Sequence, residues 1–289
     1  MEAELRKLAA ELLTSKKVDV VIGYGPGALE GRVTPVFIRK PEDAGRLVWN
    51  DRCYQNLTRY LRKPEVVAMG RPGIVVKGCD MRSIVGLIVE NQLKREGLFV
   101  IGVSCQGMIR IAPDGKPAGP SPKCVGCQVL APKGCDTVVG PTEGLKSPAG
   151  TGLEDELAKL NAMTPAERWA YWKAEFDRCI RCYACRQVCP HCFCATCICE
   201  KTTPQWISPS ATSAGNFAWN VFRALHLAGR CSGCQECARV CPVGIRLDLI
   251  NRQLANDMKD AFGFESGADE KSPPPLACYK PNDKQEFIR

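Results

Sequence analysis

Hydrophobic residues in the first third of the chain fall into short runs that are separated by polar and glycine-rich segments. Four of these runs have the length and composition of buried strands, and they lie at 18–22, 33–38, 73–77 and 98–103. Between the last two runs, apolar residues recur at helical spacing over 80–96, where Asp80 is placed to cap a helix. This β-α-β succession predicts an α/β module with a small parallel or mixed sheet.

The pattern changes in the middle of the chain. Residues 112–152 are rich in Pro, Gly and Lys, and we expect loops there. Thr164, Pro165 and Glu167 have the spacing of a capping box with proline at the first helical position, so a helix is predicted to begin at this point.

Three more segments complete the outline. Residues 1–17 are predicted to form a charged amphipathic helix, and further helices are expected at the end of the insert 190–230 and over about 246–260. The proline-rich tail 263–289 cannot build a core of its own, and we expect it to be disordered or to lie on a partner.

Two cysteine motifs of the form C-x2-C-x2-C-x3-C-P dominate the second half of the chain. The first contains Cys179, Cys182, Cys185 and Cys189, and the second contains Cys231, Cys234, Cys237 and Cys241. In ferredoxins with two [4Fe-4S] clusters, three thiolates of such a motif bind one cluster and the fourth crosses to the other. We therefore predict cluster A on Cys179, Cys182, Cys185 and Cys241, and cluster B on Cys231, Cys234, Cys237 and Cys189. A pair of structural zinc sites is the alternative, but zinc needs four ligands only and has no use for an evenly spaced triplet.

Further cysteines lie in the first module, at Cys79, Cys105, Cys124, Cys127 and Cys135. Cys79 and Cys105 follow the strands that flank the 80–96 helix, and ligands bind at the carboxyl ends of strands in open α/β sheets. A site there brings Cys79, Cys105, Cys124 and Cys127 together, with Cys135 as the competing fourth ligand. We predict a third [4Fe-4S] cluster; zinc and unligated cysteines are the alternatives. Cys53 has no partner motif and is expected to be a small buried side chain.

The insert opens with four more cysteines, Cys192, Cys194, Cys197 and Cys199. Two interpretations stay open: packing and hydrogen-bond shielding around cluster A, or ligands for a further cluster completed with the help of a partner. His191 and His226 are expected not to be ligands, because a histidine is seldom found in a cubane site dominated by thiolates. The glycine-rich segment 23–27 lacks the spacing of a dinucleotide fingerprint, and we predict a turn.

Composition narrows the class of protein. The 289 residues suffice for two modest domains, and the nineteen cysteines are spaced as metal ligands rather than as a disulfide framework. No apolar export signal or membrane span is visible, so we expect a reducing cytoplasm, as in an anaerobe. The formal net charge of +8 comes from dispersed basic residues, which disfavours nucleic acid as a partner.

The segment KGCDMRSIVGLIVENQLKREGLFVIGVSCQGM (77–108) resembles the N-terminal module of the deazaflavin-dependent hydrogenase/dehydrogenase beta-subunit family. That family places a cysteine after a strand, another in an IGxxCxG element and a CxxC pair downstream. The resemblance implies that Cys79, Cys105, Cys124 and Cys127 hold the third cluster, in preference to sets with Cys135.

The segments 179–197 and 226–245 look like the dicluster half of iron–sulfur subunits. Such subunits accompany heterodisulfide-reductase-like, hydrogenase-like or formate-dehydrogenase-like proteins. The partners that the resemblance implies are therefore proteins of these classes or a flavoprotein. Two departures matter. The ferredoxin motifs follow the first module here, whereas family members usually have them ahead of it, and the large C-terminal region that helps to hold flavin and deazaflavin is missing.

These observations predict an α/β N-terminal module followed by an α+β, loop-rich dicluster ferredoxin-like domain with added helices. The expected parts are an α/β module at 1–140, a linker at 141–163, the dicluster domain at 164–262 and an extended tail at 263–289. The expected function is a non-catalytic electron-transfer subunit of an oxidoreductase complex. The alternatives are a flavin-containing subunit, with FAD that no motif supports, and an iron–sulfur nucleic-acid or regulatory protein.

Overall fold

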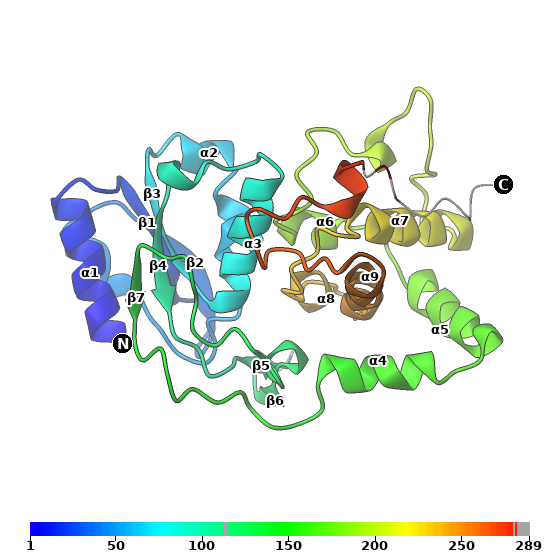
Figure 1. Ribbon diagram of the computed structural model, residues 1–289, viewed down its shortest axis with the longest axis horizontal. Coiled ribbons are helices and arrows are strands. Elements are labelled where there is room, and N and C mark those ends of the chain that lie inside the picture. The colour runs from blue at the N-terminus through cyan, green and yellow to red at the C-terminus, as the bar shows by residue number, and fades with distance from the viewer. Residues whose placement is uncertain (113–114, 280, 282–289) are drawn as a thin grey trace.

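The first half of the chain forms a mixed five-stranded sheet in the order β2-β1-β3-β4-β7 (Figure 1). The computed structural model describes residues 1–112, 115–279 and 281. The strands of this sheet are β1 (Val20–Pro26), β2 (Val33–Ile38), β3 (Pro72–Val76), β4 (Phe99–Val103) and β7 (Thr137–Val139). Strand β2 runs antiparallel to β1, and the other neighbours are parallel. The predicted α/β module with a mixed sheet is therefore correct.

The central strands are buried on both faces. The interior residues of β1, β3 and β4 are almost all fully buried, which explains why their apolar runs are continuous rather than alternating. Helix α1 (Glu2–Thr14) covers one face of the sheet through Leu5, Ala9 and Leu12 (Figure 1). Helix α3 (Gly78–Val89) covers the other face and connects β3 to β4.

Helix α3 differs from its sequence-based prediction at both ends. It begins at Gly78, so Asp80 is the third helical residue and its carboxylate accepts a hydrogen bond from the Lys77 backbone N–H at 3.1 Å. It ends at Val89 rather than near residue 96, and Asn91 then adopts a left-handed φ of 55° that no helix can continue.

Strand β1 extends through the glycine-rich segment for which we predicted a turn. A Cβ atom on Gly23 would lie 2.4 Å from Leu47 Cδ2, and one on Gly25 would lie 2.5 Å from Val36 Cγ1. These glycines therefore serve close packing within the sheet. The expected loops at 112–152 also contain regular structure, namely β7 and strand β6 (Pro117–Pro120), which pairs with β5 (Ile109–Ile111).

The second half is built from helices and loops. Its helices are α4 (Leu153–Asn161), α5 (Pro165–Asp177), α6 (Ala184–Val188), α7 (Ser213–His226), α8 (Glu236–Arg239) and α9 (Leu247–Phe262). Helix α5 begins at the predicted capping box, where the Glu167 N–H donates to Thr164 Oγ1 at 3.3 Å. Helix α4 lies in the segment that we predicted to be a linker. Its Leu157 and Leu160 pack with Leu249 of α9 in a small separate core.

Short helical turns complete the described structure. They are α2 (Pro64–Val67), η1 (Pro41–Arg46), η2 (Leu57–Tyr60), η3 (Arg95–Gly97), η4 (Pro122–Cys124), η5 (Ile198–Glu200) and η6 (Pro275–Ala277). Within the described part of the chain, none of the helices combines the length and apolar character needed to cross a membrane.

The start of the tail packs on the chain itself. Glu265 forms an ion pair with Arg82 of α3, and Ser266 Oγ donates to the Arg230 carbonyl at 2.9 Å. The red end of the ribbon accordingly runs back between α3 and α7 (Figure 1). Our expectation of a disordered or partner-bound tail is thus wrong for this part, while 282–289 lie outside the described residues.

Candidate functional site

The two cysteine motifs adopt the same local backbone. Arg181 and Gly233 stand one residue before the second cysteine of each motif, with φ of 57° and 72°. Tyr183 and Gln235 stand one residue after it, with φ of 58° and 59°, and the short helices α6 and α8 begin directly behind them. These left-handed residues, three of which are not glycine, curl each loop tightly, and such positions are rare without a structural demand.

Two cavities lie against these loops, and each is lined by cysteines of both motifs. Cavity A is lined by Cys179, Cys182, Cys185 and Cys241. Cavity B is lined by Cys231, Cys234, Cys237 and Cys189. The fold thus brings together the sets that the crossing of the fourth cysteine predicts. The Ile245 N–H donates to Cys241 Sγ at 3.3 Å, and Asn251 Nδ2 donates to Cys237 Sγ at 3.6 Å.

A larger cavity of about 400 Å³, cavity C, opens at the carboxyl edge of the sheet. Cys79, Cys105, Cys124 and Cys127 all line it. Strands β3 and β4 are parallel neighbours, so Cys79 and Cys105 come from the same sheet edge. Cys135 is not among the lining residues. It lies instead against β4, where a Cβ on Gly102 would approach its sulfur to 2.8 Å.

Backbone amides already point at the sulfurs of cavity C. The Gly107 N–H donates to Cys105 Sγ and the Met108 N–H donates to Cys124 Sγ, both at 3.3 Å. Such hydrogen bonds stabilise a thiolate and tune a bound cluster. The residues present therefore fit an iron–sulfur cluster, which would be held by the four cysteines.

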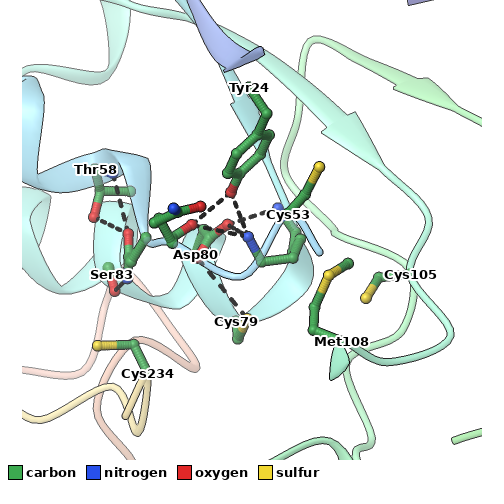
Figure 2. A network of polar contacts seen from close by, with 12 residues as sticks. Tyr24, Cys53, Thr58, Cys79, Asp80, Ser83, Cys105, Met108 and Cys234 are labelled. Atoms are coloured by element: carbon green, nitrogen blue, oxygen red, sulfur yellow. Dashed lines mark hydrogen bonds and ion pairs between the residues drawn. The ribbon is translucent and has the colours of Figure 1, made fainter. Parts of the chain in front are cut away.

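A buried ion pair adjoins cavity C. Lys77 Nζ lies 2.7 Å from Asp80 Oδ2, and the two side chains are 1% and 0% exposed. Lys77 also donates to the hydroxyl of Tyr24. Figure 2 shows Tyr24 and Asp80 in this network, with Cys79 and Cys105 nearby. Burial opposes the charge on Lys77, but Asp80, Tyr24 and Cys79 together outweigh it and hold the pKa of Lys77 well above its usual range.

A second, half-buried cation connects cavities C and B. Lys123 lines cavity C, and its Nζ donates to the Cys234 carbonyl at 2.9 Å and lies 3.8 Å from the centre of the Tyr54 ring. Burial acts against its charge, while Tyr54 and Cys79 raise the pKa of Lys123. Sequence reasoning missed both lysines, because an isolated lysine gives no signal of burial.

Hydroxyl groups join the two halves beside these cations. Ser83 Oγ of α3 lies 2.7 Å from Ser232 Oγ, which stands next to Cys231, and it accepts a hydrogen bond from Asn56 Nδ2 at 2.8 Å. Tyr54 donates to Gln235 Oε1 at 3.3 Å. Figure 2 shows Ser83 close to the loop of Cys234. The first module therefore holds the loop that lines cavity B.

Three of the four cysteines of the insert line one cavity, and the fourth does not. Cys192, Cys194 and Cys197 line a further cavity, together with His191 and His226. Cys199 is buried beside Cys197 but does not line that cavity. Burial, with the charge of Arg230 as a lesser cause, lowers the pKa of His191 to about 4, so its imidazole is neutral near pH 7.

The cysteine cavities do not have the geometry of single-ion sites. Among the described residues, no three His, Cys, Asp or Glu side chains converge closely enough to hold one metal ion. The cysteines instead surround open space. Cys53 is fully buried in the core of the first module, as its lack of a motif predicts.

The chain is similar in sequence to known proteins, at modest identity or over part of its length. No family model matches the chain. It is 34% identical over 104 residues to the F420-dependent formate dehydrogenase subunit beta of Methanocaldococcus jannaschii, which is 36% of this chain and 27% of that protein. The chain thus spans about a quarter of the length of that relative.

A second relative aligns over more of the chain. The F420-dependent formate dehydrogenase 1 subunit beta of Methanococcus maripaludis is 22% identical over 353 aligned positions, which cover 92% of this chain and 90% of the relative. A chain of the F420-reducing [NiFe] hydrogenase complex from Methanosarcina barkeri is similar over 37% of this chain and 38% of its own, with 18% identity and a TM-score of 0.31. A TM-score this low carries no argument about the fold.

Proposed function

We propose that this chain is an iron–sulfur electron-transfer subunit of an F420-linked oxidoreductase complex. The observation that carries the proposal is that cavities A, B and C are each lined by one complete set of the cysteines that motif spacing and resemblance assign to a [4Fe-4S] cluster. The names of the two relatives supply the class of partner, an F420-dependent formate dehydrogenase.

The order of the cavities favours a relay. Cavities C and B share the lining residues Ser232, Gly233 and Arg252. Arg223 lines cavity B, and its Nη2 donates to the carbonyl of Cys185, which lines cavity A. Clusters in these sites would be neighbours in the order C, B, A, with the first module at one end and the dicluster half at the other.

Buried cations fit anionic clusters. A [4Fe-4S] cluster with four thiolates carries a net negative charge in its oxidised and reduced states, and burial of that charge needs compensation. Lys77 and Lys123 supply positive charge at cavity C, and Arg223 supplies it between cavities A and B. The role of the chain is then to set burial, hydrogen bonding and charge around each cluster. None of the nineteen cysteines, all of which lie in the described part of the chain, forms a disulfide, so each is available as a thiolate ligand.

A flavin-containing subunit is the second candidate, and the size of cavity C favours it. At about 400 Å³, this cavity is much larger than cavities B and A, at about 30 and 20 Å³. Its volume lies within the range of small-molecule sites. A flavin there would split electron pairs into single electrons.

Iron, acid-labile sulfide and flavin per chain, measured on protein purified without oxygen, separate the two functions. A pure relay requires at least about twelve irons and no flavin, since each cubane contributes four. About eight irons with one flavin would instead establish the second candidate. An iron content below about eight would refute the assignment of clusters A and B themselves.

A further inference from the structure

We propose that the insert holds a fourth iron–sulfur cluster, ligated by Cys192, Cys194 and Cys197, with His191 as the fourth ligand. The site would be an additional cluster at the surface end of the relay, so its role in electron transfer rests on the function proposed above. The existence of the site rests on separate observations.

The first observation is a cavity of suitable size. The three cysteines line a cavity of about 50 Å³, whereas cavities B and A measure about 30 and 20 Å³. The insert therefore offers as much space as the two sites that carry the ferredoxin motifs.

The second observation is an imidazole without partners. His191 is only 4% exposed, and neither ring nitrogen has a hydrogen-bond partner within the described part of the chain. Its ring is held against α3, since a Cβ on Gly86 would lie 2.8 Å from His191 Cε1. A buried polar group without a partner is costly, and a metal ligand role removes that cost.

Two arginines hold Phe193, the residue between Cys192 and Cys194 in the sequence. The guanidinium groups of Arg62 and Arg230 both lie over the Phe193 ring, each 5.3 Å from the ring centre. Arg62 Nη1 also donates to the Phe193 carbonyl at 3.4 Å. Residues two apart in an extended segment share a face. Because the arginines fix Phe193, its two neighbours Cys192 and Cys194 are held in place, and both line the cavity.

The charge and position of the cavity suit an anionic redox centre. Arg223 and Arg230 line it, and Arg223 is 5% exposed with its Nε unpartnered among the described residues. His191 and Arg223 also line cavity B, and Trp219 is shared with cavity A. The far side of the cavity reaches solvent, where Cys194 is exposed. A cluster here would connect the buried relay to the surface.

The test uses Cys194→Ser and Cys197→Ser in the full chain, purified without oxygen. Cys192 is left intact because it contacts Cys189, which lines cavity B. Cys278→Ser is the control, since Cys278 contacts the Pro274 carbonyl in the tail and does not line the cavity. We expect about sixteen irons in the wild type and in the control, and about twelve in each test variant.

A second pair of variants isolates the histidine. His191→Leu should lose the same four or so irons, whereas His191→Cys should retain them, because a thiolate replaces the imidazole as ligand. A structural role for His191 would not give this difference.

Several outcomes would overturn the fourth cluster. They are wild-type iron in both test variants, loss of zinc with iron unchanged, and loss of all iron from both serine variants, which would tie the thiols to the fold rather than to a cluster of their own. The proposed function fails separately, if Cys182→Ala leaves the iron content and the spectrum of cluster A unchanged.

Discussion

The two halves of this protein assemble their cysteines in opposite ways. In the second half, each triplet lies on one tight loop whose left-handed residues, such as Tyr183 and Gln235, gather the sulfurs locally. In the first half, Cys79 in the first turn of α3, Cys105 after β4 and the CxxC pair come from separate segments, which meet because β3 and β4 are parallel neighbours. A set of cysteines can therefore be brought together by local spacing or by sheet topology, and only local spacing is visible without the fold.

The two halves also differ in how they bury charge. Cavity C is flanked by Lys77, which is fixed by Asp80, and by Lys123, which reaches across to the Cys234 carbonyl. Around cavity B the positive charge comes from Arg223, which is 5% exposed, and Asn251 adds a neutral donor to Cys237 Sγ. The first module thus places lysines beside its cysteines, and the second half places an arginine beside its own.

Removal of cysteine ligands should give the largest effects. Cys182→Ala and Cys234→Ala are each expected to remove one cubane and stop electron flow, whereas Cys105→Ala should remove about four irons and leave the signals of clusters A and B. Iron analysis and low-temperature electron paramagnetic resonance would measure this.

The prediction that the fourth cysteine of each motif binds the cluster of the other motif can be tested by the same iron analysis and spectroscopy. Cys241→Ala should abolish the signal of cluster A, and Cys237→Ala that of cluster B, although both belong to one motif. Cys278→Ser is the control and should leave the iron content unchanged. Retention of full iron and activity in Cys182→Ala or Cys234→Ala would refute the ligand assignment.

Lys77→Met should destabilise the first module strongly. It leaves the buried Asp80 carboxylate without its partner, and loss of one member of a buried ion pair costs about 3–5 kcal/mol. Denaturant unfolding followed by tryptophan fluorescence would report this change in the free energy of unfolding. Lys17→Met, at an exposed lysine, is the control. Equal stability of the two variants would mean that the ion pair contributes nothing to the fold.

Asn251→Leu should shift the reduction potential of cluster B to more negative values. It removes the Nδ2 donor to Cys237 Sγ and so destabilises the reduced, more negative cluster. A hydrogen bond to a charged group contributes about 1.5–3 kcal/mol, so a shift on the order of 60 mV is expected. Redox titration would measure it. Asn256→Leu, on the same helix but bonded to Glu154, should leave the potential unchanged.

Thr164→Ala should have the smallest effect, on stability alone. The Glu167 N–H loses its side-chain acceptor at the start of α5, which costs about 1 kcal/mol. Thr164→Ser retains the acceptor and should unfold like the wild type. A change in iron content in Thr164→Ala would contradict the view that this cap acts only on the helix.

Much of the fold follows from local patterns. The strands at β1 to β4, the start of α5 at Thr164 and the helices α7 and α9 all lie where hydrophobic periodicity and capping residues predict them. Errors occurred where tertiary packing overrode the local signal. Gly23 and Gly25 belong to a strand because Leu47 and Val36 leave no room for a side chain.

The sequence by itself predicted which cysteines of the two motifs line a common cavity, because a regular spacing of thiols in a short loop largely fixes their relative positions. It determined the α/β module as well, because continuous apolar runs suit a sheet covered on both faces. The spacing alone left Cys127 and Cys135 as alternatives, and the tertiary structure places Cys127, which the resemblance implied, in the lining of cavity C. Only the tertiary structure decided that Lys77 and His191 are buried, and Lys123 half-buried, beside the cavities. Those facts depend on contacts between segments far apart in the chain, which no local pattern records.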